Sequence, residues 1–277
     1  LAKSIEFFKA LPVAPYDSAY VSEGLMFNEM LEKAQGLKLI DIADADGAKI
    51  VALSEEGQLS STFLRNNTLH VFLFSSLVAT IVVNSQKISN KRLKAICLKL
   101  YPFLKAELFL AWEQKVIEKV VDQTLEIFLA QSAIVKKHYG YQLPGTEQSP
   151  HLLLLSQVAA ANIQRFFMTA ELLYQTQSNP VDQDELVKTV TLVSKRFAML
   201  HPCHAPDFLD QHLFQGFINQ LVVHGMVDRL DNGLVATKDL LVARDYGKYL
   251  LTAANLSTIS EVIKAVLDAK EETVHPS

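Results

Sequence analysis

The chain has 277 residues, with 26 Lys or Arg against 30 Asp or Glu, and its formal net charge is −4. This balance argues against a general nucleic-acid binder, whose affinity comes from neutralising phosphates. Only two cysteines and 49% hydrophobic residues argue against a disulfide-built secreted domain and favour a protein with large interfaces or a membrane-surface location.

Residues 1–61 are predicted to form a joining segment that contains one small hairpin. Pro12 and Pro15 interrupt the first helical pattern, and Gly24 interrupts the next. Two β-compatible runs follow at residues 37–42 and 48–53, and Asp46-Gly47 between them favours a tight turn with positive φ.

The stretch from Phe63 to Val83 is the most apolar of the chain, and we predict that it is a helix around which the rest is organised. Residues 66–86 include no Asp, Glu, Lys or Arg. The apolar run proper, residues 69–83, is shorter than the roughly 18 residues typical of a membrane-spanning helix, so a buried core helix is favoured over a lipid-contacting one. Past His70 its polar side chains are few, and three of them, Ser76, Thr80 and Asn84, form one narrow line at spacings of four residues.

The residues after this helix indicate two similar halves. In the first, helices are expected from Ser89 to Leu100, over residues 102–110 and over residues 113–131, followed by a hairpin around His138-Tyr139-Gly140. The second half is expected to contain a long helix at residues 151–176 and shorter ones at residues 182–192 and 194–200. A further helix is expected from Asp207 to Gly225, and then a hairpin at Asp231-Asn232-Gly233.

Three helices closed by a hairpin is the order of a winged-helix unit. The predicted fold class is therefore mainly α: a helical domain with small β-hairpins and two winged-helix-like repeats. The joining segment at residues 1–61 precedes a first repeat at 62–148, and a second repeat with closing helices occupies 149–277.

Few residues have the chemistry of a self-sufficient site. His201-Pro202-Cys203-His204 has metal-ligand residue types but no second pair at zinc spacing, so a polar loop is favoured and no metal site is predicted. His224 and Asp228 are four residues apart, but Gly225 is expected to end the helix between them. Cys97 and Cys203 are expected to be inert thiols, and no phosphate-binding glycine loop or nucleophile motif is present.

A basic run between residues 87 and 99 could contact phosphates of nucleic acid or lipid, although a solvated face is the favoured interpretation. Its members are Lys87, Lys91, Arg92, Lys94 and Lys99.

Three blocks carry a family resemblance: FLRNNTLHVFLFSSLVATIVV, LYPFLKAELFLAW and KRFAMLHPCHAPDFLDQHLFQGFINQLVVHGMV. In sequence, order and spacing they resemble the C-terminal portion of the bacterial membrane-associated glycerol-3-phosphate 1-O-acyltransferases, over about residues 37–240. The resemblance implies an enzyme of phospholipid biosynthesis that transfers a fatty acyl group from acyl carrier protein or acyl-CoA to sn-glycerol 3-phosphate. It further implies a location on the cytoplasmic side of the inner membrane, contact with the membrane surface, no cofactor and no nucleic-acid partner.

The catalytic motifs of that family are absent from this chain. No histidine is followed five positions later by aspartate, as His-x4-Asp requires, and Phe-Pro-Glu-Gly does not occur. Because the chain also opens on Leu1 rather than Met, we expect both motifs upstream, in an acyltransferase domain, and expect this fragment alone to be inactive. No residue here inherits a catalytic role. Contact with the catalytic domain is expected at Arg65, Asn66 and Asn67, for which capping and domain docking are the alternative interpretation.

A tandem winged-helix-like module that binds protein or nucleic acid is the alternative function, and a purely structural dimerisation domain is a third. Residues 207–224 would include the second recognition helix, but they contain two Asp and no Lys or Arg, which argues against DNA.

Overall fold

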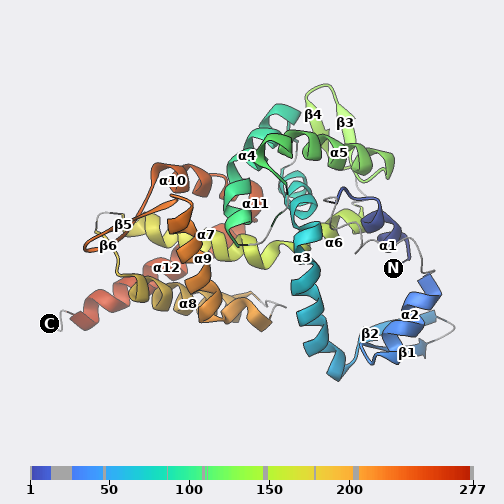
Figure 1. Cartoon of the computed structure of the whole chain (residues 1–277), viewed down its shortest axis with the longest axis horizontal. Coiled ribbons are helices and arrows are strands. Elements are labelled where there is room, and N and C mark those ends of the chain that lie inside the picture. Colours follow the sequence, from blue (N-terminus) through green and yellow to red (C-terminus); the bar gives the residue numbers. More distant parts are fainter. Residues whose placement is uncertain are drawn as a thin grey trace.

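The computed structural model describes residues 2–13, 27–45, 48–85, 87–107, 110, 112–145, 149–177, 179–201 and 206–274. Helices dominate this part of the chain, and its strands form three separate antiparallel hairpins (Figure 1). The predicted class, mainly α with small hairpins, is therefore confirmed. Pro15, Gly24 and the Asp46-Gly47 turn lie outside the described residues.

The first hairpin pairs β1 (Ile40–Ala45) with β2 (Ala48–Leu53), as predicted, although its first strand begins later than expected. The shift arises because Leu37 and Lys38 donate backbone hydrogen bonds to Lys33 and Gln35 and so close the preceding helix, α2 (Phe27–Gly36). Before it, α1 (Ala2–Lys9) places Phe7 in the core.

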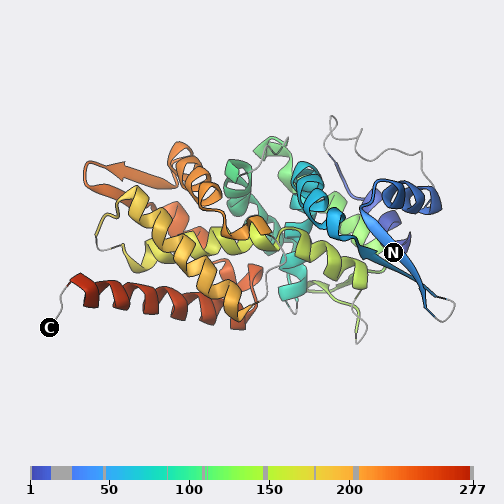
Figure 2. The ribbon, with the colours of Figure 1, turned by 90° about the horizontal axis from the view of Figure 1, so that it is seen from below.

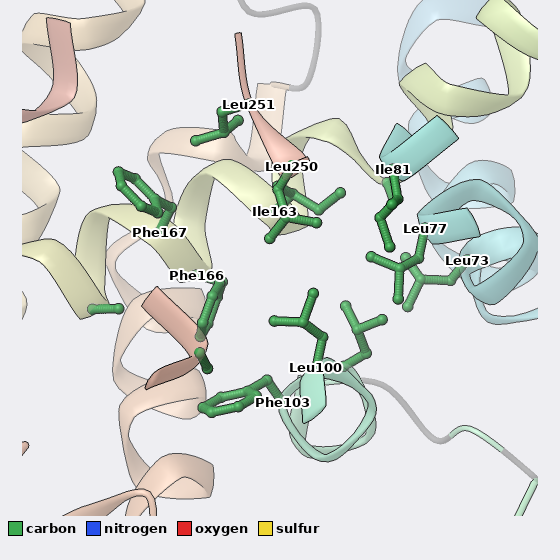
Figure 3. Close-up of a cluster of buried hydrophobic side chains, with 14 of the residues drawn as sticks. Leu73, Leu77, Ile81, Leu100, Phe103, Ile163, Phe166, Phe167, Leu250 and Leu251 are labelled. Carbon is green, nitrogen blue, oxygen red and sulfur yellow. The ribbon is translucent and has the colours of Figure 1, made fainter. Parts of the chain in front are cut away.

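The central helix α3 (Glu55–Asn84) is continuous over 30 residues and contains the whole predicted apolar stretch. From Val71 to Val82 most of its side chains are buried, and Leu77 is only 1% exposed. Figure 3 shows Leu73, Leu77 and Ile81 pointing toward Leu100 and Ile163 of two other helices. The core interpretation is confirmed for the part of the helix from Leu69 to Val82, whereas Phe63, at the start of the predicted stretch, is exposed.

The predicted long helix at residues 151–176 is instead two helices, α6 (Pro150–Val158) and α7 (Ala160–Gln175), which part at Ala159. The polar line of α3 lies at this break. The Ser76 hydroxyl accepts a hydrogen bond from the Ala159 amide (2.9 Å), and the Thr80 hydroxyl donates to the Ser156 carbonyl (3.0 Å). Because backbone groups at a buried helix end require partners, these two bonds stabilise the break.

The first half continues with α4 (Asn90–Glu107), a 3-10 turn (Gln114–Val116), α5 (Ile117–Ala130), and the hairpin β3 (Val135–Lys137) with β4 (Gly140–Gln142). The predicted helix end before Pro102 is wrong, because α4 runs through this proline. Proline removes one backbone donor; burial of Tyr101, Phe103 and Leu104 beside it offsets that loss.

The second half contains α8 (Gln183–Leu200), a 3-10 turn (Pro206–Leu209), α9 (Gln211–Val223), and β5 (Val227–Leu230) with β6 (Gly233–Ala236). The expected division near Val193 is wrong, since no helix breaker stands there. Asp210, not Asp207, caps α9 through the His212 amide. The buried face of α9 therefore consists of Phe214, Phe217, Ile218 and Leu221, whereas Leu209 and Leu213 are exposed.

Three helices close the chain: α10 (Lys238–Arg244), α11 (Gly247–Leu250) and α12 (Ala253–Val274). Figure 2 shows α12 running alongside α8. A contact near each end fixes this pairing: Lys270 binds Glu185 of α8, and Thr258 lies 3.1 Å from the His201 ring nitrogen.

The two halves repeat one geometry at a constant spacing. Ile88 forms a two-bond bridge to Tyr141, and Val181 forms the same bridge to Leu234, 93 residues later (181 − 88). The bounds of α4 and α8 differ by the same 93 residues (183 − 90 and 200 − 107). Each half contains a long apolar helical segment, then two helices rather than the predicted three, then a hairpin.

Glycine occupies the first position of the second strand in the β3–β4 and β5–β6 hairpins because the bridging residue Ile88 or Val181 passes close by. A Cβ added at Gly140 would lie 2.1 Å from the Ile88 carbonyl oxygen, and one at Gly233 would lie 2.7 Å from that of Val181. Both glycines also have φ of +139°, which disfavours any side chain.

Leu77→Asp is expected to unfold the chain, because an unpaired carboxylate in a close-packed core costs several kcal/mol out of a total stability of about 5–15 kcal/mol. Phe63→Asp on the same helix is the matched control, since Phe63 is 69% exposed and should tolerate the charge. Urea denaturation followed by circular dichroism measures both. A cooperatively folded Leu77→Asp protein would show that this face of α3 is not a core.

Gly140→Ala should destabilise the chain by more than about 1 kcal/mol, owing to the backbone clash and the strained φ. Gly216→Ala is the control: this glycine lies within α9 with no atom near its Cβ position, so alanine should stabilise by roughly 0.5–1 kcal/mol. The same denaturation experiment decides between them, and equal effects of the two substitutions would contradict the proposed steric role.

Candidate functional site

Several large exposed apolar side chains lie on a projecting segment near the start of the chain, which we call the arm: α2, the β1–β2 hairpin and residues 55–67 of α3. In Figure 1 the arm extends downward from the body of the molecule. Helix α2 has no buried residue. Four large apolar side chains of the arm face solvent: Leu37, Ile50, Leu53 and Phe63. Large apolar side chains that face solvent on one projecting segment make it a candidate interaction site.

The arm is held in one orientation by Ser54, the N-cap of α3. Its hydroxyl accepts from the Gly57 amide (2.8 Å) and donates to the Lys38 carbonyl, while its amide donates to the Leu39 carbonyl (3.2 Å). A Cβ at Gly57 would lie 2.0 Å from that Leu39 oxygen, so the hairpin base and the helix start are in direct backbone contact. The exposed apolar side chains are therefore presented by an ordered surface.

The predicted contact residues Arg65, Asn66 and Asn67 lie on this arm, within α3. Asn67 is exposed, and the side chains of Arg65 and Asn66 lie outside the described residues. Their alternative interpretation as helix caps is wrong, because α3 begins ten residues earlier, at Glu55. Sequence reasoning missed the four exposed apolar side chains, since an apolar residue in a sequence does not reveal whether it is buried.

A small pocket opens between the end of α3, the α6–α7 break and the start of α12. Its lining is made of hydroxyl, amide and aliphatic groups: Thr80, Val83, Asn84, Ser156, Gln157, Ala160, Gln164, Leu250, Leu251, Thr252 and Asn255. None of these side chains carries a charge. A pocket of this composition has no cation to bind a phosphate and no carboxylate or imidazole to act as a general base.

The most buried carboxylate is Glu171 on α7, and its bonds connect three helices. It accepts from Arg244 of α10 (2.6 Å), Gln175 (2.9 Å) and Ser260 of α12 (3.2 Å), and Arg244 also lies 3.9 Å from the centre of the Tyr174 ring. Burial raises the pKa of Glu171, but the hydrogen bonds and charge of Arg244 outweigh it and hold the pKa below its ordinary value. This carboxylate is a structural anion rather than a proton acceptor near neutral pH.

The histidine and cysteine patterns do not assemble a site in the described part of the chain, where no three His, Cys, Asp or Glu side chains group together. His201 stacks on Phe197, and residues 202–205, including Cys203 and His204, lie outside the described residues. His224 follows the end of α9, and Asp228 lies beyond the Gly225 turn in β5. Burial raises the pKa of the Cys97 thiol, which makes it unreactive.

The basic run is engaged mostly within the chain. Lys94 pairs with Asp122 (2.6 Å) and Lys99 with Asp239 (2.5 Å). Arg92 lies 5.3 Å from the centre of the Tyr246 ring, and Lys87 lies 4.9 Å from that of Tyr139. The run is therefore a packed helix edge rather than a free phosphate-binding patch.

Among the described residues, one helical window, Asn67–Asn84, is long and apolar enough to cross a bilayer by length and composition. Within the fold 67% of this window is buried, as expected for the core helix of a folded domain.

Comparison with known proteins identifies the relatives of this chain. Residues 1–229 match the family described as glycerol-3-phosphate acyltransferase C-terminal region. The chain is similar to the glycerol-3-phosphate acyltransferase of Ectopseudomonas mendocina, with 32% identity over 97% of this chain and 32% of that protein. It is also similar to the enzyme of the same name from Pseudomonas fluorescens strain SBW25, with 30% identity over 100% of this chain and 34% of that protein. The chain thus spans about a third of the length of the curated relatives it matches.

Glu171→Gln should lower stability at neutral pH by about 1–3 kcal/mol, because the buried bond to Arg244 loses its charge. Since folding lowers the pKa of Glu171, the ionised group stabilises the fold above its unfolded pKa of about 4.5 and loses that effect as pH falls through the lower folded value. The difference in free energy of unfolding between wild type and variant should therefore shrink as the pH falls below about 4.5. Urea titrations across this range measure it, with the exposed Glu126→Gln as control; a pH-independent difference would refute the ionic role.

Proposed function

The chain belongs to the family of glycerol-3-phosphate acyltransferase C-terminal regions, and from this premise we propose that it is the non-catalytic scaffold of such an enzyme. The complete protein would transfer a fatty acyl group from acyl carrier protein or acyl-CoA to the 1-hydroxyl of sn-glycerol 3-phosphate, in phospholipid biosynthesis. The observation that carries the proposal is the match of residues 1–229 to this family.

The chemistry of this chain supports a scaffold rather than a catalyst. Acyl transfer to a hydroxyl needs a general base and a group that binds the acceptor phosphate. The sequence contains neither His-x4-Asp nor Phe-Pro-Glu-Gly, and Glu171 is committed to its bond with Arg244. Both functions are therefore assigned to an upstream acyltransferase domain.

The arm is the surface proposed to contact that domain. It presents apolar side chains on an ordered backbone and includes the predicted residues Arg65, Asn66 and Asn67. Ordered apolar side chains surrounded by polar ones are the usual core of a protein interface. We place the complete enzyme at the cytoplasmic side of the bacterial inner membrane, in contact with the membrane surface.

The division into a joining segment (1–61), a first repeat (62–148) and a second repeat with closing helices (149–277) stays a proposal. The equal spacing of bridges, helices and strand glycines supports it. A nucleic-acid function has no such support, because α9 carries no Lys or Arg, and α5 carries three acids, Glu118, Asp122 and Glu126, against one Lys.

The purified 277-residue chain is expected to transfer no acyl group, because it lacks the base and the acceptor-phosphate motif. The measurement is incorporation of labelled glycerol 3-phosphate into lysophosphatidate with acyl-CoA as donor. Turnover above that of a boiled sample would refute the scaffold assignment.

Phe63→Asp and Leu53→Asp in the complete enzyme should each lower acyltransferase activity by ten- to a hundredfold, the usual effect of a charge at the centre of an interface. The isolated chain should keep its stability with either change, because both side chains are exposed. Leu154→Asp on α6, also exposed, is the matched control and should leave activity unchanged. Equal activity of all three variants would exclude the arm as the docking surface.

A further inference from the structure

Helix α8 exposes a line of alternating basic and apolar side chains, which we call the α8 ridge. Its members are Lys188, Leu192, Lys195, Arg196 and Met199, and Leu200 lies beside its end. Met199 is 84% exposed and Leu200 62% exposed. Spacings of three and four residues place Lys188, Leu192, Lys195 and Met199 on one side of the helix, opposite the buried Leu186, Val190 and Phe197.

The charged side chains of the ridge are all positive. Residues 186–200 contain no Asp or Glu, and within the described chain none of Lys188, Lys195 and Arg196 forms an ion pair. Two acids stand at the start of the helix: Glu185 is bound to Lys270, and the exposed Asp184 lies one turn before Lys188. From Lys188 to the end of the helix, three cations and exposed aliphatic groups share one surface with no acid of α8 among them.

The fold itself makes no use of this surface, as the equivalent helix of the first half shows. The positions 93 residues earlier lie on α4, where Lys99 pairs with Asp239 and Phe103 packs on Phe166 with ring centres 4.8 Å apart. The α4 face is therefore occupied inside the molecule. On α8 the same positions, Leu192 and Arg196, face solvent, and Figure 2 shows α8 crossing in front of α7 with no element drawn over it.

We propose that the α8 ridge is a contact site for an anionic lipid surface, which deepens the membrane association of the proposed function and rests on it. A helix that lies flat on a bilayer directs Leu and Met toward the acyl chains, while Lys and Arg reach the phosphates with flexible stems. An acidic protein is the less favoured partner, because on the ridge cations alternate with aliphatic side chains along one helix, whereas a protein interface usually has an apolar centre inside a polar rim.

The test is co-sedimentation of the 277-residue chain with vesicles, without any substrate. The chain should bind vesicles of phosphatidylglycerol and phosphatidylethanolamine, should bind phosphatidylcholine vesicles far more weakly, and should be released by salt. A triple variant, Lys188→Gln with Lys195→Gln and Arg196→Gln, should bind anionic vesicles on the order of a hundredfold more weakly. The reason is that each cation near an anionic surface raises the affinity about fivefold. Leu192→Ser with Met199→Ser should weaken it on the order of tenfold.

The matched control removes three exposed cations elsewhere: Lys91→Gln, Lys119→Gln and Lys137→Gln. Control and ridge variants lose the same charge, so equal losses of binding would overturn the ridge as a defined site. Equal binding of wild type to anionic and neutral vesicles would overturn it as well, as would binding to purified acyl carrier protein without binding to vesicles. Because no acyl transfer is measured, failure here is distinct from failure of the scaffold proposal, which the activity assays decide.

Discussion

The hydrogen bonds between the polar line of α3 and the α6–α7 break are the constraint on which the rest of the fold depends. The buried segment of α3, from Leu69 to Asn84, has no charged side chain. Aliphatic contacts have no direction, so they alone would let this segment rotate against its neighbours at little cost in free energy. Ser76 and Thr80 remove that freedom, since the Ala159 amide and the Ser156 carbonyl have to meet them. The orientation of α7 follows from this junction, and with it the positions of Phe166 and Phe167 in the second half of the core.

The sequence predicts those features whose causes are local. The apolar length of α3 and the turn residues of the second and third hairpins act within a few residues, and these elements form as expected. The break between α6 and α7 was not predicted because its cause lies far away along the chain. Nothing near Ala159 signals the end of α6, since the group that satisfies it, Ser76, lies 83 residues away along the chain. Pro102 has the opposite effect: a local signal for a helix end is overruled by burial of its neighbours.

The difference between local and distant causes also explains why the exposed candidate surfaces could not be predicted from the sequence. Leu53 and Phe63 have the residue types of a core, so their exposure could not be predicted without knowing which surfaces pack against them. The comparison of α4 with α8 makes this concrete. The backbone of the two halves is constrained by close contacts, such as those at Gly140 and Gly233, whereas the side chains of the two helices have diverged according to what covers them. Phe103 is buried where Arg196 is exposed.

A continuous series of helix contacts connects the arm to the α8 ridge. The scaffold proposal therefore predicts that the two surfaces keep a fixed relative position. The Lys270–Glu185 contact joins α8 to α12, and the Ser260–Glu171 bond joins α12 to α7. Helix α7 meets α3 at the Ala159–Ser76 bond, and α3 continues without a break into the arm. In Figure 1 the arm and α8 both lie toward the lower side of the molecule, with the arm on the right and α8 left of centre. A lipid surface bound at the ridge and a catalytic domain bound at the arm would therefore be held at a fixed relative height. Under the proposed function the acceptor would be water-soluble and the acylated product lipid-soluble, so that fixed height would determine how far the product must travel to reach lipid.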